Sequence, residues 1–172
     1  MSLMAYLKTK DLDNMQELLV EELKDLYDVE NRIIDSLPKM EEAATNPNLK
    51  EAFRKHKQQS QWQKERLERC FQSLGIDPDR STCDGIKGIL EEGETVLKAK
   101  GDPRVKDAAL IASAQRVEHY EMAAYGAART FARNTNHDDV AELLQQTLDE
   151  EGNTDHELTE LGVSQVNPPS GQ

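Results

Sequence analysis

Apolar residues recur at three- and four-residue steps through four long stretches of this 172-residue chain. That period puts them on one face of an α-helix, so each stretch is predicted to form an amphipathic helix. A capping residue followed by proline predicts helix starts at Asn46-Pro47 and Asp102-Pro103, and Gly75 predicts a helix end. Aromatic residues make up only 5% of the chain, which also favours an all-α fold. The predicted helices cover about residues 12–37, 47–74, 103–133 and 138–161.

The connections between these helices predict how they pack. The first and second helices, and likewise the third and fourth, are joined by a few residues, which makes each pair an antiparallel hairpin. Residues 76–101 separate the two hairpins and can cross the length of a bundle, and Ile86, Ile89 and Leu90 predict a short helix on the way. Two hairpins joined by one long crossover have the ferritin-like connectivity. We therefore predict an all-α, ferritin-like antiparallel four-helix bundle.

The limits of the bundle are predicted at residues 10 and 162, within a length that suits one domain. Residues 1–9 are expected to form an N-terminal extension, and because Met4 offers a second start, residues 1–3 are treated as an expression remnant. Residues 163–172 end in prolines and small polar residues and are expected to form a flexible tail. Pro38 is expected to kink the first helix or to break it briefly before residues 39–44.

The charge of the chain excludes two classes of partner. Asp and Glu number 33 against 21 Lys and Arg, which gives a net charge of -12. Nucleic acids and anionic membrane surfaces attract the opposite sign, and no apolar stretch approaches the roughly 20 residues of a spanning helix. We therefore expect no nucleic acid and no membrane as partners. Cys70 and Cys83 have no CxxC spacing and no signal peptide is recognised, so a cytoplasmic protein is expected.

Polar residues occupy the middle of each predicted apolar stripe. The three- and four-residue spacing continues through them, which places them on the core face of their helices. They are Glu30 in the first helix; His56, Gln59 and Gln63 in the second; Glu118 and Glu121 in the third; and Thr147, Glu151 and Asp155 in the fourth. A buried carboxylate costs several kcal/mol even after relaxation, and clustered carboxylates also repel one another. Something must compensate: a bound cation, shared protons or basic partners.

A bound cation is the solution used in carboxylate-bridged metal proteins, in which Glu residues from two helices join Glu-x-x-His pairs from the other two. Glu30, Glu118 and Glu121 fit that plan, and Glu151 and Asp155 offer two further carboxylates. These five residues are the candidate ligands for two iron or manganese ions.

The second helix departs from this plan. Gln59 and Gln63 would coordinate through neutral amide oxygens, which are poor ligands for iron. His56 lies one turn before Gln59 on the same face and could substitute, so His56, Gln59 and Gln63 are the weaker candidate ligands. If Gln59 and Gln63 abolish metal binding, the ions are expected to be absent. His156 points about 100° away from Asp155 and is expected at the surface.

A hydrogen-bonded network without metal is the alternative account of this cluster. Gln59 and Gln63 can donate to Glu30 or Glu151, and the hydroxyl groups of tyrosines can donate as well. The tyrosines in reach are Tyr27, Tyr120 and Tyr125. Hydrogen bonds from the glutamines would then stabilise the carboxylates in place of the positive charge of a metal ion.

Several segments resemble the YciE/YciF family of bacterial ferritin-like stress proteins, over about residues 10–162. The most specific is Gln115-Arg116-Val117-Glu118-His119-Tyr120-Glu121, and the others are residues 23–30, 82–88, 124–126 and 147–151. The resemblance implies a bundle that forms a homodimer and is associated with stress responses. It also implies Glu-Thr-x-x-His in the second helix, where this chain has Gln59-Ser60-Gln61-Trp62-Gln63. Both ligands that the resemblance implies there are thus glutamine.

Two functions are predicted as alternatives. The first is a ferritin-like stress protein with a weak or vestigial dinuclear site; as an enzyme it would be an oxidoreductase acting on ferrous iron, oxygen or peroxide. The second is a non-enzymatic, dimeric structural or interaction protein with a hydrogen-bonded polar core. DNA protection ranks last, because the chain lacks a basic tail.

Overall fold

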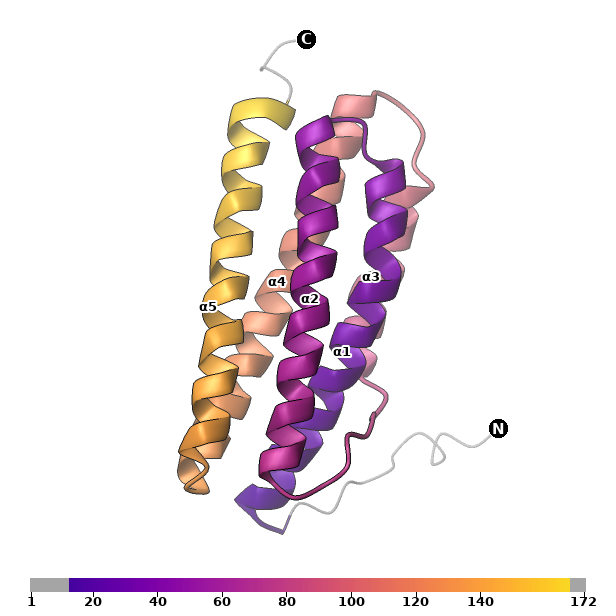
Figure 1. Cartoon of the computed structure of the whole chain (residues 1–172). Coiled ribbons are helices and arrows are strands. Elements are labelled where there is room, and N and C mark those ends of the chain that lie inside the picture. The colour runs from indigo at the N-terminus through magenta and orange to yellow at the C-terminus, as the bar shows by residue number, and fades with distance from the viewer. Residues whose placement is uncertain (1–12, 168–172) are drawn as a thin grey trace, which may run out of the picture.

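The computed structural model describes residues 13–167, which form six helical elements and no strand. Four long helices lie side by side, with a shorter one along their flank (Figure 1). The elements are α1 (Met15–Ala43), α2 (Pro47–Ser73), α3 (Asp84–Leu97), α4 (Pro103–Asn134), α5 (Asp138–Leu161) and the π-helix η2 (Gly162–Val166). No helix within residues 13–167 is both long and apolar enough to cross a membrane.

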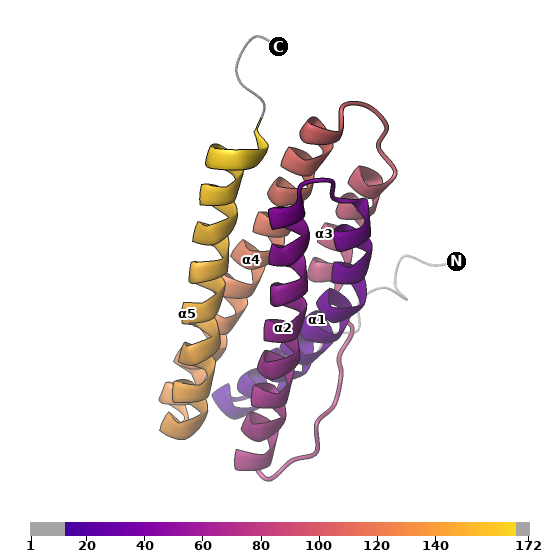
Figure 2. The same ribbon diagram turned by 45° about the horizontal axis from the view of Figure 1, so that its top comes forward.

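The long helices pack as a ring in which each has two neighbours. Helix α1 packs on α2 and α4, and α5 packs on the same two helices, while α3 lies against α4 and α1. Both ribbon views place α2 between α1 and α5 (Figures 1 and 2). The crossover between α2 and α4 returns the chain to the end of the bundle where α2 began (Figure 1). The predicted ferritin-like connectivity, with a short helix in the crossover, is confirmed.

The helix starts follow from side-chain capping. Asn14 accepts a hydrogen bond from the backbone N–H of Glu17, and Asn46 and Asp102 accept in the same way ahead of the prolines that begin α2 and α4. Helix α1 continues through Pro38 to Ala43, so the predicted break at this proline does not occur.

The bundle continues past its predicted end at residue 162. Gly162–Val166 add a π-helical turn, and the side chain of Val166 is buried in the core. The first part of the predicted tail, residues 163–166, is therefore helical and is anchored by Val166, whereas Val163 is 74% exposed. Residues 1–12 and 168–172, where the remainder of the two predicted terminal segments falls, lie outside the described residues.

The apolar core consists of two clusters along the length of the bundle. One includes Ile33, Phe53 and Leu110, and the other includes Leu23, Phe71 and Leu144. The predicted core stripe of α4 is buried throughout, and that of α1 is buried from Leu19 to Leu37, whereas Met15 at the start of α1 is 38% exposed. Along α1, Glu30 is buried between Leu26 of the second cluster and Ile33 of the first. Polar residues therefore interrupt the apolar core in mid-bundle.

Candidate metal centre

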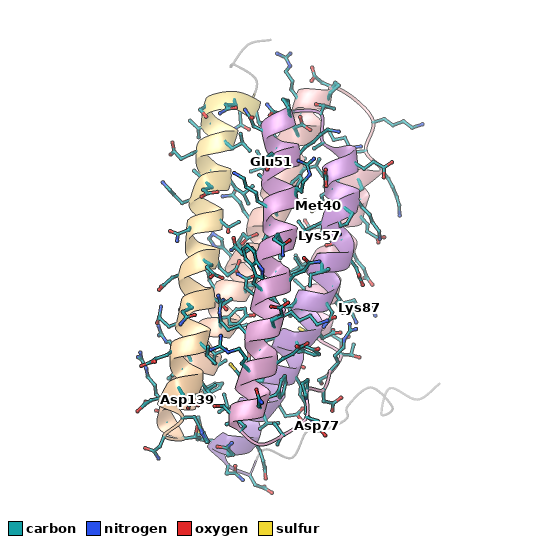
Figure 3. The ribbon with its side chains drawn as sticks, viewed as in Figure 1. Met40, Glu51, Lys57, Asp77, Lys87 and Asp139 are labelled. Carbon is teal, nitrogen blue, oxygen red and sulfur yellow. The ribbon has the colours of Figure 1, made fainter. Side chains whose placement is uncertain are left out.

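A cluster of one histidine and three glutamates lies in this interruption. It joins His56 of α2, Glu118 and Glu121 of α4 and Glu151 of α5, each with one ligand atom within 4.8 Å of the others. All four residues are buried. Side chains fill the space between the long helices (Figure 3). The three glutamates are 0% exposed and His56 is 5% exposed. His56 Nδ1 lies 3.3 Å from Glu118 Oε1.

Glu30 of α1 belongs to the same polar layer. Its side chain is 0% exposed, and the Tyr125 hydroxyl donates to Glu30 Oε1 over 2.5 Å. The negative charge of Glu151 acts on Glu30, and a proton on either carboxyl would let Glu30 and Glu121 hydrogen bond to each other. All four long helices therefore contribute to the layer.

Most carboxylate oxygens of the cluster lack a hydrogen-bond donor among the described residues. Both oxygens of Glu118 and Glu121, and one each of Glu30 and Glu151, are buried without a partner, as is His56 Nε2. Ionised carboxylates only accept hydrogen bonds, so they cannot satisfy one another. Either protons or a cation must lie between them.

Buried carboxylates elsewhere in this fold are well supplied with donors. Asp28 accepts from Arg32, Arg80 and the backbone N–H of Cys83. Asp107 accepts from the backbone N–H groups that precede α2 and from a threonine hydroxyl. The shortage of donors in the central cluster is thus not a general property of buried carboxylates in this fold.

A partial hydrogen-bond network surrounds the cluster. The Gln63 amide donates to Glu151 Oε1 and, over 3.0 Å, to Glu150 Oε2. Tyr27 and Tyr120 are directed elsewhere, since Tyr27 donates to Glu68 and the Tyr120 hydroxyl lies 2.8 Å from Cys83 Sγ. Only part of the network that the sequence suggested is therefore formed.

Burial raises the pKa of every glutamate in the layer. The pKa values of Glu30, Glu118 and Glu121 lie well above their usual value, first through desolvation and then through the negative charge of Glu151. Desolvation also raises the pKa of Glu151 to about 7. It lowers the pKa of His56 to about 4, so the imidazole is neutral near pH 7 and keeps a lone pair. A bound cation would reverse the penalty on the glutamates.

Arg66 is a neighbour of the cluster that the sequence did not single out. Its guanidinium donates to Glu150 over 2.8 and 2.9 Å and to the Thr147 hydroxyl over 2.7 Å. Its positive charge lowers the pKa of Glu30 and Glu151, which offsets a small part of the burial effect. Its position three residues after Gln63, at the edge of the apolar stripe, was the available signal.

Two sequence candidates lie beside the cluster. Gln59 is half-buried and donates to the Thr154 hydroxyl over 3.1 Å, while Ser60, the next residue, is fully buried. Asp155 is 22% exposed and accepts from Gln115, with the ring of His119 3.3 Å away. Neither Gln59 nor Asp155 is among the four clustered residues.

The donor set suits a transition metal ion. Neutral imidazole together with carboxylates binds iron and manganese, among other divalent ions. Four donors lie close enough to surround one ion, from His56, Glu118, Glu121 and Glu151. Glu30 is a further carboxylate, whose charge interacts with that of Glu151. These residues fit a metal centre, with Gln63 as a neutral neighbour.

Comparisons with known proteins agree with the fold and identify the family. Residues 14–169 match the family described as Domain of unknown function (DUF892). Protein YciF of Escherichia coli (strain K12) is 35% identical over 158 residues, which cover 91% of this chain and 95% of that protein.

Two solved structures superpose closely. The crystal structure of the E. coli stress protein YciF gives a TM-score of 0.87 at 34% identity, covering 92% of this chain and 100% of that one. YcfI of Rhodopseudomonas palustris, whose description proposes a structural role, gives a TM-score of 0.84 at 38% identity, covering 89% and 98% of the two chains. The chain therefore belongs to the DUF892 family and is a relative of the stress protein YciF.

Proposed function

We propose that this protein is a ferritin-like stress-response protein that binds iron or manganese ions in its polar layer. The first ion would be held by His56, Glu118, Glu121 and Glu151, and Glu30 would contribute to a second. Because Gln63 is neutral, we expect the second ion to be held more weakly than the first. We further propose that the protein works in the cytoplasm as a homodimer, in line with its two free, buried cysteines and with the family resemblance.

The unpartnered carboxylate oxygens are the observation that carries this proposal. Glu118 and Glu121 together offer four buried oxygens without a donor, beside an unpartnered imidazole nitrogen. Hydrogen bonds from protein groups could have satisfied them, as they do at Asp28 and Asp107, but the described residues supply none. Bound iron would bring one-electron chemistry toward oxygen or peroxide. The protein groups hold the ligands in place, and Tyr125 keeps a proton against Glu30.

A non-enzymatic structural or interaction protein is the second candidate function. Two hydrogen bonds favour it, from Gln63 to Glu151 and from Tyr125 to Glu30, because both belong to a core that could be satisfied without metal. In that case the remaining carboxyl groups would share protons. Retention of metal separates the two candidates.

Protein purified without chelator and loaded anaerobically with Fe²⁺ or Mn²⁺ is expected to retain between one and two ions per chain after desalting, as measured by elemental mass spectrometry. Glu121→Gln is expected to lower the affinity by at least about tenfold, in the range found for changes around metal ligands. Glu160→Gln, an exposed change on α5, is the control and should retain the wild-type content. If the wild-type protein retains no ion under any loading condition, the structural candidate replaces the proposed function.

A further inference from the structure

The seam between α2 and α5 is the side on which the buried cluster comes nearest to a surface cavity. A cavity of about 40 Å³ opens between the two helices, lined by Phe53, Lys55, His56, Gln59, Thr154 and Glu157. A water molecule needs roughly 10–15 Å³ of such space, so the cavity has room for about three or four. His56 belongs both to this wall and to the cluster.

His56 connects the cavity to the cluster. Its Nδ1 faces Glu118 at 3.3 Å, whereas Nε2 is buried and has no hydrogen-bond partner. His56 lines the cavity and carries an unpartnered ring nitrogen, which can bind water or a cation. The other nitrogen of the same ring faces Glu118, so only the imidazole ring separates this nitrogen from the carboxylates.

Polar side chains span the α2/α5 seam at three successive levels. Farthest from the cavity, Arg66 binds Glu150 and Thr147, and at the middle level Gln63 binds Glu150 and Glu151. Beside the cavity, the Gln59 amide donates to the Thr154 hydroxyl over 3.1 Å, and that hydroxyl donates to the backbone carbonyl of Glu150.

The three cross-links differ in strength. The Arg66 contact is ionic and charge-assisted, and the Gln63 amide bonds to carboxylates, whereas Gln59 and Thr154 form a single hydrogen bond between neutral groups. Neutral hydrogen bonds contribute the least net stability and therefore open most readily. The level beside the cavity is the weakest closure of this seam.

Resting on the proposed function, we propose that the cavity between α2 and α5 is the access path for divalent cations and that the Gln59–Thr154 hydrogen bond closes it. Gln59 thus acts as a gate and not as a ligand. Opening the gate needs only rotation of two side chains, with no movement of the helices. The gate controls how fast an ion reaches the cluster but leaves the number of ligands unchanged.

Two gate variants and one matched control test this access path. Gln59→Ala removes the donor and Thr154→Val removes the acceptor. Gln115→Ala is the control, because Gln115 is also a glutamine that joins a neighbouring helix to α5, through Asp155 and Thr159, but on the α4/α5 seam. Uptake of Co²⁺ is followed by its absorbance in stopped flow.

Both gate variants are expected to take up Co²⁺ roughly threefold to tenfold faster than the wild type, the factor expected from the loss of one neutral hydrogen bond. The final stoichiometry and the rate of the control should stay at wild-type values. Unchanged rates in the gate variants, or equal acceleration in Gln115→Ala, would overturn the access path.

Chemical labelling of His56 tests the path without any metal. Diethyl pyrocarbonate modifies imidazole nitrogens, and mass spectrometry of peptides separates His56 from the exposed His119 and His156. Gln59→Ala and Thr154→Val should accelerate labelling of His56 relative to His156, and Gln115→Ala should not. Accelerated labelling in a protein that binds no ion would reject the proposed function and keep the path, whereas unchanged labelling overturns the path itself.

Discussion

Raising the pH from 6.5 to 8 is expected to lower the free energy of unfolding of the metal-free protein, with a slope of about 1.4 kcal/mol per pH unit for each carboxyl that stays protonated in the folded state. The cause is the raised pKa of the buried glutamates. A carboxyl that stays protonated in the folded state but ionises in the unfolded state favours folding at low pH, and this contribution is lost as the pH rises toward the folded pKa. For Glu151 the window runs from the usual pKa of 4.5 to about 7, and the raised pKa values of Glu30, Glu118 and Glu121 act in the same direction.

His56 acts in the opposite direction over a lower range of pH. Its pKa falls from 6.5 to about 4, so the unfolded state binds the extra proton between these values and stability decreases as the pH falls through them. Above pH 6.5 the imidazole is neutral in both states and no longer contributes. The glutamates alone therefore set the slope between pH 6.5 and 8 within the central layer.

Urea unfolding in the presence of a chelator measures this slope. The free energy of unfolding should decrease steadily from pH 6.5 to 8. In the metal-loaded protein the slope should be smaller or reversed, because metal binding favours the deprotonated ligands. A flat or rising profile for the chelated protein would mean that the glutamates are already ionised, and would contradict the assignment of an uncompensated cluster.

Changing Glu118 or Glu121 to Gln is expected to stabilise the metal-free protein by about 1–4 kcal/mol at pH 8. Glutamine keeps the shape of the side chain and removes the cost of either burying a charge or keeping the carboxyl protonated at this pH. At pH 6 the gain should shrink, because less free energy is then needed to keep the wild-type carboxyls protonated. The same variants should lose the stabilisation that Fe²⁺ or Mn²⁺ gives the wild type.

Denaturation with and without metal reads out both effects in one experiment. Glu160→Gln should change the stability by less than about 0.5 kcal/mol in either state, as expected for an exposed substitution. Destabilisation of metal-free Glu118→Gln and Glu121→Gln would mean that the carboxylates accept hydrogen bonds that matter for the fold. A gain in stability with unchanged metal content would remove both residues from the metal site.

The fold was predictable because it depends on local signals. Proline after Asn46 and Asp102 fixes two helix starts, and the lengths of the connections fix the order of the hairpins. Pro38 was harder to interpret, because a proline at an exposed position can remain inside a helix that tertiary packing holds. The burial of Val166 depends on contacts with residues distant in the chain, which its local sequence does not indicate.

The polar layer was predictable as a pattern but not in every residue. The positions of Glu30, Glu118, Glu121 and Glu151 follow from the helical period, and all four are buried. On α2 the period could not decide between Gln59 and Ser60, because they lie three and four residues after His56 and both continue the helical spacing. The rotation that packs α2 against α5 buries Ser60 and leaves Gln59 at the seam.

The role of His56 illustrates the same limit. From the sequence it was a weaker ligand candidate, because a histidine one turn away from the expected position is as easily a packed core residue. Packing brings His56 Nδ1 to 3.3 Å from Glu118, which no local pattern specifies. Pairing between helices, not the sequence of one helix, therefore decides which residues form the cluster.

The most direct test of the metal centre is anomalous diffraction from crystals loaded with Mn²⁺ and measured near the manganese absorption edge. We expect an anomalous peak enclosed by His56, Glu118, Glu121 and Glu151, with a weaker second peak toward Glu30. An empty layer in loaded crystals, or manganese bound only to acidic residues on the surface, would contradict the proposed metal centre.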